Sequence, residues 1–191
     1  MNKISSKKIY GVVICYNSEN AIKNLYERID MDLFDKIYFF DDNSTDNSYE
    51  IARKFDWEVI KNENNLGHGG NLKKAVKTAF EDGADFVLEI HADNQYDPNL
   101  ISKAKKFIDQ DYALIIGSRF VNKNPHKEEG MPFIRFISNK LMSFMTGKLL
   151  SIKLTEFHTG FKIFGKSFNE NVPFENCSNT VSYTHLTLPT T

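Results

Sequence analysis

Short apolar runs alternate with stretches of helical periodicity along the first two thirds of the chain. Runs rich in β-branched and aromatic residues predict strands at 9–16, 36–40, 57–60, 86–90 and 113–116. Between them, apolar residues recur every three or four positions, most regularly from Leu72 to Phe80, and predict helices. We therefore expect an α/β fold with a Rossmann-like, mostly parallel sheet, right-handed crossovers and flanking helices.

Polar residues and a proline mark the expected helix starts. Asn17 and Ser18 offer caps for the first helix, and Ser44 caps the second. Pro98 follows the fourth strand and opens a helix that includes Leu100 to Ile108. Each expected helix thus begins in a polar loop directly after a strand.

The alternation stops at Gly117. Residues 117–132 form a loop rich in charge, Asn, Gly and Pro, and so long a loop inside a domain is usually functional or mobile. A helix is expected from Phe133 to Leu150, apolar around most of its circumference, with three basic residues between: Arg135, Lys140 and Lys148. We expect this helix to pack under the sheet; the alternatives are a partner contact and a membrane surface.

Composition predicts one soluble domain. The chain has 191 residues, 41% of them hydrophobic and 26% charged. Its 24 basic and 25 acidic residues give a net charge of -1, so no global field favours nucleic acid as a partner. Cys15 and Cys177 form no disulfide framework, which fits a reducing compartment. No segment approaches the roughly 18 apolar residues of a membrane span, so we expect a cytoplasmic protein.

The C-terminal residues 181–191, VSYTHLTLPTT, differ from the rest of the chain. They carry no Asp, Glu, Lys or Arg and do not continue the preceding pattern. They resemble the in-frame translation of a transposase-type sequencing adapter; the alternative is a genuine polar tail. We therefore expect one domain over residues 1–180, incomplete at its C-terminus, followed by a non-native tail.

Polar loops follow three of the expected strands: CYNSEN, DDNSTDNS and HADNQYDP. Parallel strands end at the same edge of a sheet, where ligands bind in open α/β folds, so these loops are expected to converge. An acidic edge binds a phosphorylated donor only through a cation such as Mg²⁺ or Mn²⁺. Asp93 and Gln95 lie on one side if their loop is extended and so form a candidate metal site. The alternative is a solvated turn.

Six segments, in this order, resemble the family 2 glycosyltransferases: VVICYNSEN, FFDDNSTDNS, NENNLGHGGNLKKAV, LEIHADNQYDP, GSRF and EFHTGFKIF. The resemblance covers about Ile9 to Asn179. It implies the nucleotide-diphosphate-sugar transferase A-type fold, a donor linked to UDP or GDP, and a polyprenyl phosphate or glycan acceptor. It further implies bacterial cell-envelope biosynthesis at the inner face of the membrane.

The resemblance also implies roles for individual residues. Asp41 and Asp42 would contact the nucleobase, and Asp93 with Gln95 would bind ribose and metal. His91 stands where the family's DxD motif has its first aspartate, which leaves Asp93 as the one assured metal carboxylate. The residues expected at the donor are Tyr16, Asn17, Glu19, Asp41, Asp42, Asn65, Gly67, Gly70, Asn71 and His91.

The resemblance places two further segments near the reacting groups. Arg119, in GSR, would pair its planar guanidinium with oxygens of the acceptor phosphate or of the donor diphosphate, and His158, in HTGFK, would lie near the acceptor side of the pocket. Each residue could instead be structural. We count Asp93, Arg119 and His158 as the candidate catalytic residues.

We therefore expect a metal-dependent, inverting glycosyltransferase. In the family, the general base for a hydroxyl acceptor generally lies beyond HTGFK, whereas a phosphate acceptor is already nucleophilic and needs none. One alternative is a truncated or degenerate module that binds nucleotide without transfer. A sugar-1-phosphate nucleotidyltransferase lacks support, because CYNSEN replaces the Gly-rich, Arg-bearing loop of those enzymes.

Overall fold

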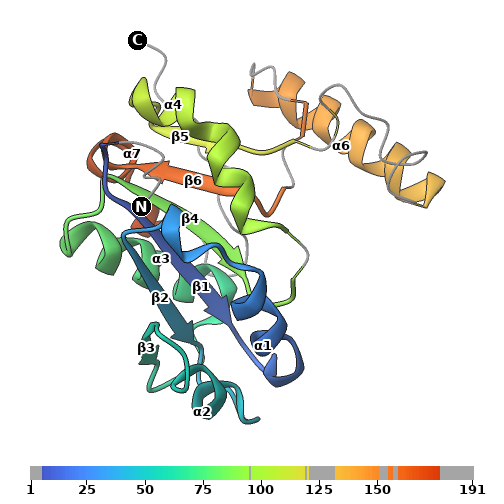
Figure 1. Cartoon of the computed structure of the whole chain (residues 1–191). Coiled ribbons are helices and arrows are strands. Elements are labelled where there is room, and N and C mark those ends of the chain that lie inside the picture. Colours follow the sequence, from blue (N-terminus) through green and yellow to red (C-terminus); the bar gives the residue numbers. More distant parts are fainter. Residues whose placement is uncertain are drawn as a thin grey trace.

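The computed structural model describes residues 6–94, 96–118, 120, 132–150, 155–156 and 159–176. At its centre is a six-stranded sheet in the order β3-β2-β1-β4-β6-β5 (Figure 1). The strands β1 to β4 are parallel, and β6 runs antiparallel to both of its neighbours. The mostly parallel α/β sheet is thus confirmed. The strands are β1 Ile9–Cys15, β2 Lys36–Asp41, β3 Glu58–Lys61, β4 Phe86–His91, β5 Leu114–Ile116 and β6 Lys162–Gly165.

The strand β6 is the element of the sheet that the apolar pattern did not predict. It has four residues and lies between β4 and β5, with Val87 of β4 opposite Phe164. Its partners lie far away in the sequence, and a four-residue run has no periodicity of its own that separates strand from loop. The sheet is consequently mixed and not wholly parallel.

The helices largely follow the predicted periodicity. Residues 98–109 form a 3₁₀ helix that passes into a short α-helix. The second helix begins at Ser48, so the prediction that Ser44 caps it is wrong; Ser44 Oγ instead accepts a hydrogen bond from the Asn17 N–H at 2.9 Å. The α-helices are α1 Glu19–Arg28, α2 Ser48–Ala52, α3 Gly67–Glu81, α4 Lys105–Asp109, α6 Phe133–Leu150 and α7 Lys166–Asn171, and the 3₁₀ helices are η1 Met31–Leu33, η2 Pro98–Ala104 and η3 Phe174–Asn176.

Apolar residues on both faces of the sheet bury it between helices. On one face α3 packs its apolar side against the sheet, and its buried residues include all five that the periodicity indicated: Leu72, Ala75, Val76, Ala79 and Phe80. On the other face α1 contributes Ile22 and Leu25, and the segment η2–α4 contributes Ile101 and Ile108. Both layers support the same central strands, which fixes where the strand ends and their loops lie (Figure 1).

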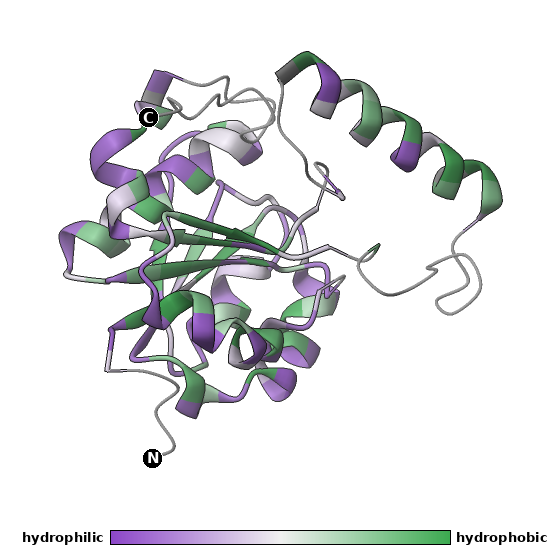
Figure 2. Cartoon of the chain, turned by 90° about the horizontal axis from the view of Figure 1, so that it is seen from above, coloured by the Kyte–Doolittle hydropathy of each residue, from purple (hydrophilic) through white to green (hydrophobic). Residues whose placement is uncertain are grey.

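The helix α6 differs from the others in its exposure. It lies to one side of the sheet, and apolar residues occur along its whole length (Figure 2). The expectation that it packs under the sheet is wrong. Eight large apolar side chains are at least 47% exposed: Phe133, Ile134, Ile137, Leu141, Met142, Phe144, Met145 and Leu149. Within the described residues, no helix is long and apolar enough to cross a membrane.

Candidate active site

A cavity of about 370 Å³ lies where β1, β2 and β4 end, beside the first turn of α3. All three loops that were expected to converge contribute to it. Its lining comprises Ile14, Cys15, Tyr16, Ser18, Asp42, Asn65, Gly67, His68, Asn71, His91, Ala92 and Asp93. Burial raises the pKa of the Cys15 thiol to about 11, so this side chain is neutral at pH 7 and offers no thiolate nucleophile.

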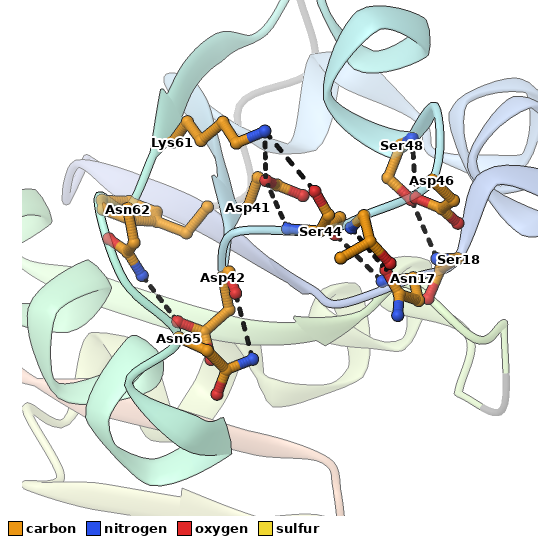
Figure 3. A network of polar contacts seen from close by, with 12 residues as sticks. Asn17, Ser18, Asp41, Asp42, Ser44, Asp46, Ser48, Lys61, Asn62 and Asn65 are labelled. Carbon is orange, nitrogen blue, oxygen red and sulfur yellow. Dashed lines mark hydrogen bonds and ion pairs between the residues drawn. The ribbon is translucent and has the colours of Figure 1, made fainter.

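Asp42 is held in this cavity by a network of buried amides. Its Oδ1 atom accepts hydrogen bonds from Asn62 Nδ2 and from the Leu66 N–H, both at 2.9 Å. Figure 3 shows Asp42 with Asn62 and Asn65 close by. Asn62 Nδ2 also lies 2.9 Å from Asn71 Oδ1, and Asn71 Nδ2 donates to the carbonyl of Phe40 at 3.0 Å. The carboxylate is therefore fixed before any ligand arrives.

Asp41 has a different environment from its neighbour. It is fully buried, and its Oδ2 atom accepts a hydrogen bond from the Ser44 N–H at 3.0 Å. Lys61 Nζ lies 4.0 Å from the same oxygen, while Oδ1 has no hydrogen-bond partner among the described residues. Asp41 is not among the residues that line the cavity, so here it holds the turn after β2.

Asn17 and Glu19 join the first loop to the second. Asn17 Oδ1 accepts a hydrogen bond from the Thr45 N–H, and Glu19 Oε2 accepts one from the Asn47 N–H, both at 2.9 Å. Figure 3 shows the Asn17 side of this junction. Neither residue lines the cavity, although both were predicted at the donor. Their side chains brace the two loops against each other.

The segment before α3 brings backbone close to the cavity. Asn65 Nδ2 donates to the Asp42 carbonyl at 3.1 Å, and Asn65 Oδ1 accepts from the Gly67 N–H at 3.0 Å. Gly67 has φ +73°, a conformation that favours glycine. Gly70 is buried within α3 and does not line the cavity. Of the predicted residues in this segment, Asn65, Gly67 and Asn71 reach the cavity.

The loop after β4 places His91 and Asp93 on the cavity but is not extended. Asn94 has φ +61°, and its Nδ2 atom donates to the Ala21 carbonyl at 2.9 Å. The prediction assumed an extended backbone from Asp93 to Gln95, and the positive φ of Asn94 shows that this assumption is wrong. Gln95 itself lies outside the described residues, as do two of the candidate catalytic residues, Arg119 and His158.

Three charged or titratable residues that sequence analysis did not select form a cluster with His91. Glu89 is buried in β4, and its Oε1 atom lies 3.1 Å from His91 Nε2 and 3.3 Å from His68 Nε2. Lys162 Nζ, on β6, lies 3.2 Å from the other carboxylate oxygen, Oε2. A signal was present: Glu89 interrupts an apolar strand two positions before His91, which puts both on one face.

The charge state of this cluster follows from its contacts. Burial alone would raise the pKa of the Glu89 carboxyl. The positive charge of Lys162, together with contacts to His68 and His91, outweighs that effect and holds the pKa well below its usual range. Glu89 is therefore a buried carboxylate at neutral pH.

Comparison with known proteins gives this geometry a family context. A family model described as Glycosyl transferase family 2 matches residues 11–172. The UDP-N-acetylglucosamine--dolichyl-phosphate N-acetylglucosaminyltransferase of Methanococcus voltae is 31% identical over 182 residues, covering 86% of this chain and 72% of that protein. The dolichol-phosphate mannosyltransferase of Pyrococcus furiosus is 28% identical over 176 residues, covering 86% of this chain and 48% of that protein.

A solved structure resembles the fold as a whole. The glucosyl-3-phosphoglycerate synthase of Mycobacterium tuberculosis, in complex with Mn²⁺, UDP and glucosyl-3-phosphoglycerate, superposes with a TM-score of 0.61 at 15% identity. The match covers 85% of this chain and 58% of that one, so this chain spans little more than half of the solved enzyme. At this identity the likeness concerns the fold alone, and it agrees with the A-type glycosyltransferase fold expected from the motifs.

Proposed function

The chain belongs to glycosyl transferase family 2, and we propose that it moves a sugar from a UDP- or GDP-linked donor to a polyprenyl phosphate. The observation that carries the proposal is the cavity at the ends of β1, β2 and β4, where Asp42 and Asp93 lie together with Asn65 and Asn71. Carboxylate and amide groups suit the hydroxyls and ring N–H groups of a nucleoside. Asp42 is the residue we propose for the base.

A divalent cation fits the charge of this cavity. Two aspartates and two histidines line it, and none of the described lining residues is Lys or Arg. A nucleoside diphosphate in this cavity would therefore meet no basic side chain among the described residues that line it. We propose that Asp93, together with Gln95, holds Mg²⁺ or Mn²⁺. When bound, such a cation stabilises negative charge on the departing diphosphate.

A phosphate acceptor requires little of the protein's side chains. In the proposed reaction a phosphate oxygen attacks the anomeric carbon, and the bond from that carbon to the nucleoside diphosphate breaks. The electron pair of that bond leaves with the diphosphate, and the configuration at the anomeric carbon inverts. No proton has to be removed from an ionised phosphate, so no general base is needed. The names of the M. voltae and P. furiosus relatives, both of which contain dolichyl or dolichol phosphate, support this acceptor class.

Nucleotide binding by Asp42 variants tests the donor half of the proposal. We expect UDP or GDP to bind the wild-type chain in the presence of Mn²⁺, as measured by isothermal titration calorimetry. Asp42→Asn preserves shape but removes the charge that strengthens its hydrogen bonds, and should weaken binding by roughly ten- to a hundredfold. Asp56→Asn, at an exposed carboxylate outside the cavity, is the matched control.

The same titration, followed by an assay of sugar transfer, separates the alternatives. No binding of either nucleotide, or equal binding by Asp42→Asn, would contradict the proposed donor site. Binding without sugar transfer to a polyprenyl phosphate would instead identify the nucleotide-binding module that was the alternative from sequence. Release of the nucleoside diphosphate that depends on the added acceptor would support the full reaction.

The exposed helix α6 is the part we propose to meet the membrane that carries the lipid acceptor. Ile134, Ile137, Leu141 and Phe144 follow helical spacing and are 47–80% exposed. The helix contains no Asp or Glu, and its basic residues suit the headgroups of anionic lipids. Phe136, in contrast, is only partly exposed, and its ring lies tilted against that of Phe120 with 5.8 Å between the centroids, so a charge at position 136 would also disturb packing.

We expect the chain to co-sediment with vesicles that contain anionic lipid. The double variant Ile134→Asp/Phe144→Asp should lose this binding at least about tenfold, because two charges replace apolar side chains that would enter the interface. Circular dichroism would show whether the fold is unchanged, and Tyr112→Asp is the control at an exposed aromatic residue outside α6. Absence of vesicle binding by the wild type would contradict the membrane proposal and leave the donor site unaffected.

A further inference from the structure

We propose that His68, Glu89 and His91 form a second metal site, which takes a first-row transition cation such as Zn²⁺ or Co²⁺. It is separate from the Mg²⁺ or Mn²⁺ site proposed at Asp93 and Gln95, and it does not depend on the proposed transfer reaction. One ligand atom from each of its three residues lies within 4.8 Å of the other two.

The local fold creates this cluster from two elements. Glu89 and His91 are two residues apart in β4, so both side chains point to the sheet face that α3 covers. His68 is the second residue of α3, directly after the backbone turn at Gly67. The first turn of α3 thus brings one imidazole to the end of β4, where the second imidazole and the carboxylate already lie.

The distances suit a shared cation. Glu89 Oε1 lies 3.1 Å from His91 Nε2 and 3.3 Å from His68 Nε2. Bonds of about 2.0 to 2.2 Å from one metal, at octahedral to tetrahedral angles, place neighbouring ligand atoms roughly 2.8 to 3.6 Å apart. Both measured separations fall within this interval, so a cation needs no large rearrangement of these two pairs.

Two buried atoms of this cluster have only each other and His68 as close polar neighbours. Glu89 Oε1 and His91 Nε2 face each other at 3.1 Å, neither has a well-aligned hydrogen bond to another described residue, and the Glu89 side chain is fully buried. Buried polar atoms in folded proteins are nearly always satisfied, by protein, water or an ion. A cation bound between this imidazole nitrogen and this carboxylate oxygen would satisfy both atoms.

Two neighbours hold the ligands of the cluster in place. Lys162 Nζ pairs with Glu89 Oε2 at 3.2 Å, which orients the carboxylate and leaves Oε1 for the metal. Gly160 faces His91: a Cβ atom at this position would lie 3.0 Å from His91 Nε2 and would clash with the Tyr96 ring. Gly160 and Tyr96 therefore pack closely against this side of His91, and a larger residue at position 160 would displace its imidazole.

The donor set determines which cations we expect. Two imidazoles and one carboxylate are ligands of Zn²⁺ and of other first-row transition ions, whereas Mg²⁺ favours oxygen ligands. His68 and His91 also line the cavity, so the remaining coordination positions face it. Water or a phosphate oxygen can occupy them.

Titration with Co²⁺ and Zn²⁺ tests this site without any activity measurement. The chain must carry no affinity tag, because a histidine tag binds both ions. We expect one equivalent of Co²⁺ to bind with visible absorption bands, Zn²⁺ to displace it, and excess Mg²⁺ to leave it in place. His68→Ala and His91→Ala should each weaken Co²⁺ binding by more than about tenfold, the least that loss of an outer-shell partner causes.

Two further variants keep the outcome decisive. Asp93→Asn should retain the Co²⁺ affinity of the wild type, which separates this site from the one proposed for the donor cation. Glu89→Gln should lose Co²⁺ binding. The matched control is Glu81→Gln, at an exposed position of α3, which should keep it. Should Glu89→Gln fail to fold, His68→Ala still decides, because His68 is partly exposed, with 38% of its side chain accessible.

The proposal would be overturned by any of three results. The first is that the wild type binds neither Co²⁺ nor Zn²⁺. The second is that His68→Ala and His91→Ala bind Co²⁺ as tightly as the wild type does. The third is that Asp93→Asn loses Co²⁺ binding. The last result would show a single site shared with the donor cation. Failure of nucleotide binding would leave this test unaffected, so the two proposals fail independently.

Discussion

Replacing Lys162 by methionine is expected to destabilise the fold by about 3 to 5 kcal/mol, because it leaves a buried carboxylate without its cation. The Glu89 side chain is fully buried, and that of Lys162 is 9% exposed, with 3.2 Å between Nζ and Oε2. The two residues lie on β4 and β6, so their pairing also joins the parallel strands to the antiparallel one. Urea unfolding at pH 7 in the presence of a chelator would measure the loss without a contribution from bound metal.

A double variant distinguishes this effect from lost packing. Glu89→Gln/Lys162→Met removes both charges, and its free energy of unfolding should recover most of the loss of Lys162→Met alone. Lys166→Met, at an exposed lysine in the first turn of α7, should change stability by less than about 0.5 kcal/mol. A loss below about 1 kcal/mol in Lys162→Met would mean that water reaches the pair and that Glu89 is not buried in solution.

Asp93→Ala is expected to lower sugar transfer by roughly a thousandfold or more in a chain that is competent for transfer. In the proposed reaction its carboxylate holds the cation that stabilises the leaving diphosphate, and several kcal/mol of transition-state stabilisation correspond to this factor. Asp93 is exposed on the cavity, so the substitution should leave the free energy of unfolding nearly unchanged. Release of UDP or GDP, measured with a polyprenyl phosphate as acceptor, gives the rate.

The control for this variant is Asp56→Ala, which removes an exposed carboxylate outside the cavity. It should transfer sugar at the wild-type rate. Transfer by Asp93→Ala within about tenfold of the wild-type rate would contradict the role of this residue in cation binding. Absence of transfer by both the wild type and Asp93→Ala would favour the nucleotide-binding module.

The place of the candidate site could be predicted because it depends on local pattern. The run from Leu72 to Phe80 has one clear periodicity, and the corresponding face of α3 is buried. Parallel strands send their following loops to a common edge whatever those loops contain. This rule brought Asp42 and Asp93 to one cavity, although 51 positions separate them in the chain. Prediction succeeded where one short segment, or the direction of a strand, carried the information.

Prediction was less successful for residues whose role depends on neighbours distant in sequence. Asp41 and Asp42 are adjacent and chemically identical, yet Asp42 lines the cavity while Asp41 is buried beneath the turn. Asn17 and Glu19 carry polar groups suited to a ligand, but those groups bind the backbone of the neighbouring loop. Hydrogen-bond partners of this kind are set by the approach of two loops, which sequence spacing does not contain.

By itself, the sequence determined the strand and helix alternation, the family and the edge of the sheet where the site lies, because periodicity, strand direction and ordered motifs are local properties. Only the tertiary structure decided that β6 is antiparallel, that α6 is exposed, and that the buried Glu89 forms a cluster with His68, His91 and Lys162. Each of these depends on contacts between segments far apart in the chain. The charge on Glu89 is the clearest case: an acidic residue in an apolar strand is tolerated because β6 supplies a lysine 73 positions later.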